Sequence, residues 1–400
     1  MKTKFKKIAA AALAAMLAVT LCGCDRGYLM TVDGVDIRNG VYLQLLQSAY
    51  SLAGTALEKQ NADNPDSSSS EEDTTPITEE MIEGKTGSQW IKDETMKAVR
   101  RFVAIQRKCE ELGIALTEEE ENEISVEVNK TWESENQYVK YLYGYNTMGD
   151  YYESQGIAQE SVKQINRVNE LQNKLFLYYY DKGGEFEVNE SEIDDYLKET
   201  YSVVKYQSLA FTDASGKALE SDADKKAVKD KAQGYVDRIN NGESVVDVFY
   251  EYNLSRVEES AAARAETDYS EDNADNLTKE QWIKQQVESA NVTKADSADD
   301  LDRYLTKEST TPDADTLDYI FKAASDGKAT LFEAENAVYI IIKDDITKKT
   351  KWKEDNHEAL LTAIKSDEFR EMIDLFGQNY EVTADENLVN KKYGPEILND

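Results

Sequence analysis

Short apolar runs and long amphipathic stretches alternate along this chain of 400 residues. Residues 201–211, YSVVKYQSLAF, are mostly apolar or aromatic and are β-branched at Val203 and Val204. This composition is typical of a buried strand. A second such run, residues 337–343, follows much later in the chain. We expect the two runs to be neighbouring strands of one small sheet, with a further strand at residues 329–333.

Helical periodicity dominates the rest of the chain. Apolar residues recur at three- and four-residue steps, which predicts helices from Asn39 onward and at residues 87–112, 118–143, 156–180, 224–239, 245–252, 315–324 and 353–379. Gly113 is placed to end the helix that precedes it. Thr117 with Glu120 and Asn189 with Glu192 have the spacing of capping boxes that begin the next helices. An Asp33-Gly34 pair between two short apolar runs predicts a hairpin over residues 28–37.

Two segments lack a core-forming pattern. Residues 60–75 are polar, acidic and Ser-rich, and we expect a disordered surface loop within residues 60–86. Residues 256–311 are rich in Asp, Glu, Lys and Ser, with weak helical patches at 281–287 and 301–305. We interpret them as an acidic insertion with little core of its own. The last helix, in contrast, must bury an apolar stripe, and the N-terminal helices are the expected partner.

The formal net charge is -33, from 79 acidic and 46 basic residues. Nucleic-acid binding needs a basic surface, so this charge argues against it. His357 is the single histidine, which excludes mechanisms and metal sites that use two imidazoles. No Gly-rich phosphate loop or CxxC motif is present. The sequence therefore predicts no cofactor and no metal.

The first 24 residues have the pattern of an export signal. Four lysines precede the apolar run of residues 8–21, which is too short for a lasting membrane span. The run ends in Leu21-Cys22-Gly23-Cys24, which resembles a bacterial lipobox. The resemblance implies removal of residues 1–23 and a lipid on Cys24 that anchors the chain to the outer face of a bacterial cell membrane. An ordinary secretory signal is the alternative. Cys109 lies on an apolar helix face and is expected to be a core residue.

Five segments together resemble PrsA-like and SurA-like extracytoplasmic foldases. They read TVDGVDIRNGVYLQLL from Thr31, NESEIDDYLKETYSVVKYQSLAF from Asn189, NNGESVVDVFYEYN from Asn240, DYIFKAASDGKATLFEAENAVYIIIKDD from Asp318 and KKYGPEIL from Lys391. The resemblance implies an α+β fold. A mostly helical chaperone domain, built from residues 24–199 and 347–400, would enclose a parvulin-like domain of a small sheet and helices at residues 200–346.

This chain departs from the family where parvulin-type peptidyl-prolyl isomerases carry two histidines. By the resemblance, Ser208 and Tyr339 occupy these positions, and the acidic insertion replaces a Gly-rich segment. Their hydroxyls are candidates for a residual catalytic pair. The plainer interpretation is that both are ordinary strand residues.

The leading hypothesis is a lipid-anchored folding factor that binds unfolded or nascent exported proteins. The candidate client-binding residues are aromatic or aliphatic, namely Tyr206, Leu209, Phe211, Phe249, Phe321 and Ile341. Two alternatives remain open, an active isomerase and a surface lipoprotein that docks one specific protein. The oligomeric state does not follow from the sequence.

Overall fold

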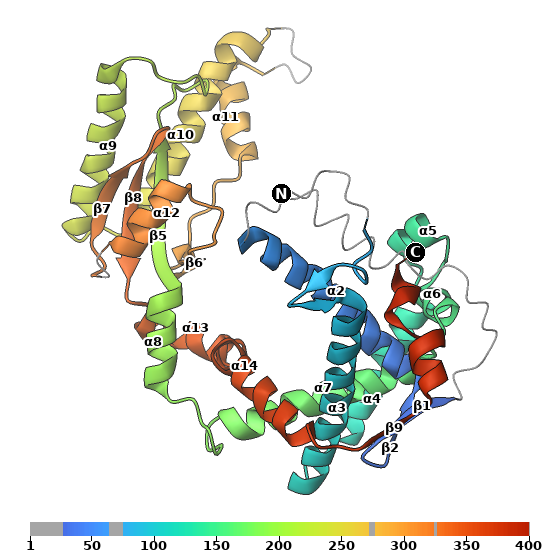
Figure 1. The fold of residues 1–400 in the computed structure, drawn as a ribbon. Coiled ribbons are helices and arrows are strands. Elements are labelled where there is room, and N and C mark those ends of the chain that lie inside the picture. Colours follow the sequence, from blue (N-terminus) through green and yellow to red (C-terminus); the bar gives the residue numbers. More distant parts are fainter. Residues whose placement is uncertain (1–26, 64–74, 272–276, 324–325, 400) are drawn as a thin grey trace. The chain divides into compact units, whose positions relative to one another are not determined.

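The computed structural model describes residues 27–63, 75–271, 277–323 and 326–399 (Figure 1). The chain divides into two compact units. Unit 1 comprises Met1–Val188 and Leu361–Asp400, so it contains both ends of the chain, and unit 2 comprises Asn189–Leu360. The described residues are mostly helical with small antiparallel sheets, which is compatible with the expected α+β class. None of the described helices combines the length and apolar character needed to cross a membrane.

Strands from the N-terminal and C-terminal parts of the described chain pair in a three-stranded sheet of unit 1. Strands β1 (Tyr28–Val32) and β2 (Val35–Arg38) form the expected hairpin, and β9 (Val382–Ala384) pairs antiparallel with β1. Asp33 and Gly34 make the turn at φ 47° and 77°, the positive values that Asp-Gly turns favour. The C-terminal tail is therefore an integral part of unit 1.

The helices of unit 1 are α2 (Asn39–Asp63), α3 (Gly87–Leu112), α4 (Glu118–Glu133), α5 (Gln137–Tyr143), α6 (Met148–Ser154), α7 (Gln159–Tyr180), most of α14 (His357–Gly377), η3 (Leu388–Lys392) and η4 (Pro395–Leu398). Gly113 ends α3 in a left-handed conformation, and Thr117 with Glu120 forms the capping box of α4. Both features were predicted. The expected single helix over residues 118–143 was wrong, because the chain is extended at Ser134 and Asn136 caps α5.

The expected loop over residues 60–86 is also corrected. Helix α2 continues to Asp63, and β3 (Met81–Ile82) pairs with β4 (Lys85–Thr86) in a short hairpin before α3. Ile82 is fully buried, which explains why this segment is structured. Residues 64–74 lie outside the described residues.

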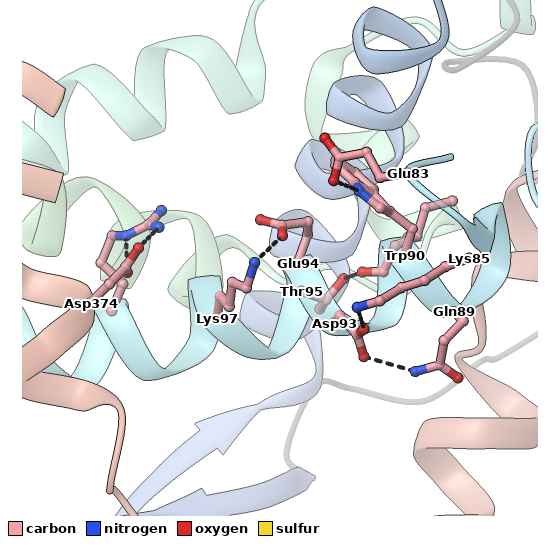
Figure 2. A network of polar contacts seen from close by, with 11 residues as sticks. Glu83, Lys85, Gln89, Trp90, Asp93, Glu94, Thr95, Lys97 and Asp374 are labelled. Atoms are coloured by element: carbon pink, nitrogen blue, oxygen red, sulfur yellow. Dashed lines mark hydrogen bonds and ion pairs between the residues drawn. The ribbon is translucent and has the colours of Figure 1, made fainter. Parts of the chain in front are cut away.

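Helix α14 packs on α3 and α7, the expected N-terminal partners. Phe369 contacts Phe176 edge to face, with ring centroids 5.3 Å apart, and both side chains are buried. Arg101 on α3 binds both carboxylate oxygens of Asp374 at 2.7 Å. Figure 2 shows Asp374 among the polar contacts of α3. The expected helix 353–379 is in fact two helices, α13 (Thr350–Asp355) and α14. Asn356 separates them and donates its side-chain amide to the Trp352 carbonyl.

Unit 2 contains a four-stranded antiparallel sheet in the order β6-β5-β8-β7 (Figure 1). Its strands are β5 (Tyr201–Ala210), β6 (Arg303–Thr306), β7 (Ala329–Glu333) and β8 (Ala337–Asp344). Strands β5 and β8 pair from Val203 opposite Asp344 to Ala210 opposite Ala337. The two apolar runs of the sequence are therefore adjacent central strands, as predicted.

Helices cover both faces of this sheet. The helices of unit 2 are α8 (Glu190–Thr200), α9 (Asp222–Asn240), α10 (Val245–Asp268), α11 (Lys279–Ser289), α12 (Ala314–Lys322) and α13, with short 3-10 turns at η1 (Asp299–Leu301) and η2 (Ile346–Lys348). Helices α9 and α10 pack on one face with Leu209, Val338 and Ile340. Helix α12 packs on the opposite face with Val204 and Ile341.

The acidic segment 256–311 is more integrated than expected. Helix α10 does not end at residue 252 but runs to Asp268 and packs against α11, with Ala261 and Ala265 buried. The expected helical patch at 301–305 was wrong, because residues 303–306 form β6 at the edge of the sheet. Leu305 points into the core on the α12 side and is 7% exposed.

Candidate functional site

Strand register places Ser208 directly opposite Tyr339, and Tyr339 directly opposite Phe332. Directly opposed residues of antiparallel strands point to the same side of a sheet. The three side chains therefore form a row across β5, β8 and β7 on the side that carries α12. Ser208 is exposed, whereas Tyr339 and Phe332 are half-buried. Sequence positions 208 and 339, singled out as candidates, are thus brought together.

A second set of rings adjoins this row. Tyr206 lies opposite Ile341, and its ring centroid is 6.1 Å from that of Tyr339. Tyr319 on α12 stacks on Phe332 with centroids 4.6 Å apart. We call this surface the aromatic face and define it by Tyr206, Ser208, Tyr319, Phe332 and Tyr339. Its four rings are half-buried, so each keeps part of its surface open to solvent.

A carboxylate interacts with the hydroxyl of the central ring of the aromatic face. Burial raises the pKa of the Tyr339 hydroxyl, and its hydrogen bond with the charged Asp313 raises that pKa further. Asp313 caps α12 by accepting from the Thr316 amide at 3.1 Å and from the Thr316 hydroxyl at 2.7 Å. Burial alone would raise the pKa of Asp313, but the Thr316 and Tyr339 donors bring it below its ordinary value. Asp313 is therefore ionised at neutral pH.

The remaining client-binding candidates do not share this surface. Leu209, Phe211 and Phe249 lie in the core under α9 and α10 with exposures of 1%, 5% and 4%. The alternation of side chains along β5 sends Leu209 to the face opposite Tyr206 and Ser208. Ile341 is on the aromatic side but is 1% exposed. The expected client-binding set is corrected accordingly, because these four side chains fill the core of the folded unit.

Phe321 is half-buried on α12, where it packs against the core cluster beneath the aromatic face. The ammonium group of Lys307 lies 5.9 Å from its ring centroid. Lys343 on β8 donates to the Ile320 carbonyl at 2.8 Å and to the Phe321 carbonyl at 3.3 Å. Burial lowers the pKa of Lys343. These contacts hold the C-terminal end of α12 on the sheet.

Sequence reasoning missed Tyr319, Phe332 and Asp313. In β7, Leu331 and Phe332 are adjacent apolar residues, so alternation alone does not say which of them faces α12. Asp313 could have been found, because an Asp three residues before Thr316 at the start of a helical pattern is an N-cap signal.

A separate cleft of about 750 Å³ lies elsewhere in unit 2. Tyr304 and Trp352 stack along its wall with ring centroids 4.5 Å apart. Lys349 contacts Asp302 at 2.7 Å and Asp344 at 3.0 Å. Seven aspartates and three lysines line the cleft, so it is acidic on balance. Within the described ranges, no group of three or more His, Cys, Asp or Glu side chains could hold a metal ion.

Of Cys24 and Cys109, the structure describes only Cys109. Cys24 lies outside the described residues. Cys109 is 2% exposed in unit 1, and its thiol donates to the Leu171 carbonyl at 3.5 Å. Burial raises the pKa of this thiol to about 11, so it stays protonated at neutral pH. Cys109 is thus a core residue, as predicted.

Comparison with known proteins adds little to this description. No family model matches the chain, and no curated protein matches it. Among solved structures, it is similar to the crystal structure of PrsA from Bacillus subtilis, with 11% sequence identity over 93% of this chain and 98% of that chain. The TM-score is 0.24, which is too low to carry an argument. The function must therefore be inferred from the chain's own residues.

Proposed function

We propose that the chain is an extracytoplasmic folding factor that holds unfolded exported polypeptides. The observation that carries this proposal is the aromatic face, where four half-buried rings from the sheet and α12 lie on the same side of the sheet as the exposed Ser208. Aromatic rings supply large contact areas at low entropic cost and tolerate many partner sequences. Such a surface suits loose binding of extended apolar segments.

Attachment to the membrane is the second part of the proposal. The lipobox-like residues 21–24 support a lipid on Cys24, which would keep the aromatic face close to the site where clients emerge. Metabolic labelling with a radioactive fatty acid tests this directly. The wild-type chain should carry label and sediment with membranes, and Cys24→Ser should do neither. Equal labelling of both chains would rule out Cys24 as the attachment point.

An aggregation assay tests client binding. The chain from residue 25 onward should suppress aggregation of a chemically unfolded protein at a near-equal molar ratio. The variant Tyr206→Ser/Phe332→Ser removes two rings of the aromatic face and should require a several-fold higher concentration for the same effect. Tyr178→Ser is the matched control, because Tyr178 is 49% exposed on α7 in unit 1. Absence of suppression across several clients would refute the proposal.

A residual isomerase is the second candidate, favoured by the Asp313–Tyr339 contact beside Ser208. Rotation about an X–Pro bond faces a barrier of about 18–20 kcal/mol, which hydrogen bonds to the twisted amide lower without any covalent step. Proline-limited refolding of a small protein measures this activity. Acceleration that is lost in both Tyr339→Phe and Ser208→Ala supports catalysis. If the wild-type chain gives no acceleration, the face is a binding surface only.

A further inference from the structure

An unusual concentration of aromatic residues lies in unit 1, apart from the aromatic face. Residues 132–152 contain seven, namely Trp132, Tyr138, Tyr141, Tyr143, Tyr145, Tyr151 and Tyr152. They belong to the end of α4, to α5 and α6 and to the turn between them, which lie together in Figure 1.

Some of these rings form an internal support. Tyr151 is 4% exposed, and its ring centroid lies 4.9 Å from that of Tyr143 and 6.0 Å from that of Tyr145. Trp132 stacks on Tyr152 at 5.9 Å. A backbone bridge between Glu135 and Thr147 closes the loop around α5. Helix α5 is therefore held in place by packing on α6, which in turn packs on α4.

The other rings point outward. Tyr141 is 87% exposed, Tyr138 is 55% exposed and Leu142 is 39% exposed. These residues stand at positions i, i+3 and i+4 of α5, so they share one side of the helix. Val139, the residue after Tyr138, is 4% exposed and attaches α5 to the rest of unit 1. We call the outward side, Tyr138, Tyr141 and Leu142, the α5 face.

The segment of the chain that carries the α5 face is acidic, and this charge restricts what can bind it. Residues 123–153 hold six carboxylates against two lysines. All six are exposed and have no Lys or Arg ion-pair partner within the described part of the chain: Glu123, Glu127, Glu133, Glu135, Asp150 and Glu153. Like charges repel a second copy of this surface and an anionic lipid headgroup layer. An oppositely charged partner gains attraction instead.

We infer that the α5 face is a binding surface for cationic polypeptide segments in which Lys or Arg alternates with apolar residues. The apolar side chains would pack against Tyr138, Tyr141 and Leu142. The cationic groups would meet the surrounding carboxylates and the open ring face of Tyr141, which attracts cations through its π electrons. The surface belongs to unit 1, so it is separate from the aromatic face and does not depend on the proposed holding of clients there.

Synthetic peptides labelled with a fluorophore test this surface on the chain from residue 25 onward. The probe is a 12-residue peptide of alternating Lys and Leu or Phe. One matched peptide has Glu in place of each Lys, and another has Ser in place of each apolar residue. Fluorescence anisotropy should show binding of the first peptide only, with affinity that falls as salt is raised. Equal binding of the Glu peptide, or of anionic lipid vesicles, would overturn the inference.

Variants then locate the binding. Tyr138→Gln/Tyr141→Gln should raise the Kd of the Lys peptide at least tenfold, whereas Tyr178→Gln, the same change at an exposed tyrosine of α7, should leave it unchanged. Glu127→Gln/Glu133→Gln keeps every ring and should reduce the salt dependence. If neither double variant alters binding, the α5 face is not the site. Tyr206→Ser/Phe332→Ser should bind the peptide normally, which separates this result from the aggregation assay.

Discussion

The ammonium group of Lys205 lies 2.7 Å from the Asp302 carboxylate, with side-chain exposures of only 6% and 3%. Lys205 is on the central strand β5, and Asp302 immediately precedes the edge strand β6. Lys205 also contacts Asp344 on β8 at 2.5 Å. This buried ion pair therefore fastens the end of the acidic segment 256–311 to the centre of the sheet.

Removing one member of the pair should destabilise unit 2. Asp302→Asn leaves the buried Lys205 with a single remaining carboxylate partner and also removes one partner of Lys349. We expect a loss of about 3 kcal/mol, the usual cost of breaking a buried pair. Urea unfolding followed by far-UV circular dichroism measures it. The double variant Lys205→Met/Asp302→Leu removes both charges and should recover most of the loss. A single variant as stable as the wild type would show that the pair contributes nothing.

Acid should weaken the same cluster through Asp344. Burial raises the pKa of Asp344, but hydrogen bonds from Lys205 and Lys349 outweigh it and bring the pKa below the ordinary value of 3.8. A carboxyl with a depressed folded-state pKa stabilises the fold above its unfolded pKa, and that stability is lost as pH falls through the folded value. Stability should therefore fall below about pH 4. Asp344→Asn should be less stable than the wild type at pH 7, and it should lose less stability than the wild type between pH 5 and pH 3. Urea unfolding midpoints at each pH measure both differences.

The sequence predicted the local features of this fold better than the distant pairings. The Asp33-Gly34 hairpin and the end of α3 at Gly113 each follow from residues a few positions apart. The β5–β8 pair is a distant pairing that was predicted, because each strand is a continuous apolar run in the sequence. Strand β6 was missed, because its four residues RYLT follow a long polar stretch and pair with β5 about a hundred positions away. Its burial depends on tertiary contacts that no local pattern records.

The candidate site, too, was predicted only in part. Ser208 and Tyr339 were found together through the resemblance to a family, and the register places them opposite each other. The client-binding set was corrected where alternation along β5 separates Tyr206 from Leu209. Tyr319 and Phe332 come from different elements and meet only when α12 packs on the sheet. The contact between these two rings arises from tertiary packing, and the spacing of the two residues along the sequence does not reveal it.

The link between α14 and α3 is open to a double-mutant cycle. Arg101 and Asp374 form a bidentate pair with side chains 26% and 36% exposed. Two parallel hydrogen bonds strengthen the pair, and solvent screening weakens it, so we expect a coupling of about 1 kcal/mol. Arg101→Ala, Asp374→Ala and the double variant should be compared in urea at low and high salt. Additive effects would mean that the pair contributes no coupling.

Cys109 should resist thiol reagents in the folded chain. Its pKa of about 11 and its burial both suppress the reactive thiolate. In the chain from residue 25 onward, alkylation at pH 8 should therefore proceed only as fast as unit 1 opens. Mass spectrometry at increasing urea should show labelling that follows the unfolding transition. Rapid labelling without urea would indicate that the α3–α7 packing around this thiol opens readily.

Replacement by alanine should lower the stability of the chain at Gly87 and raise it at Gly234. A Cβ at Gly87, where α3 begins, would lie 1.8 Å from the Ile77 carbonyl oxygen, so the backbone must shift. We expect Gly87→Ala to cost at least about 2 kcal/mol, in the range found for overpacked sites. A Cβ at Gly234, inside α9, would meet nothing within 4 Å. Because alanine favours helix, Gly234→Ala should stabilise the chain by about 0.5–1 kcal/mol. Thermal unfolding of both variants measures the two effects. A Gly87→Ala chain as stable as the wild type would mean that the segment at Ile77 moves away from the helix at little cost.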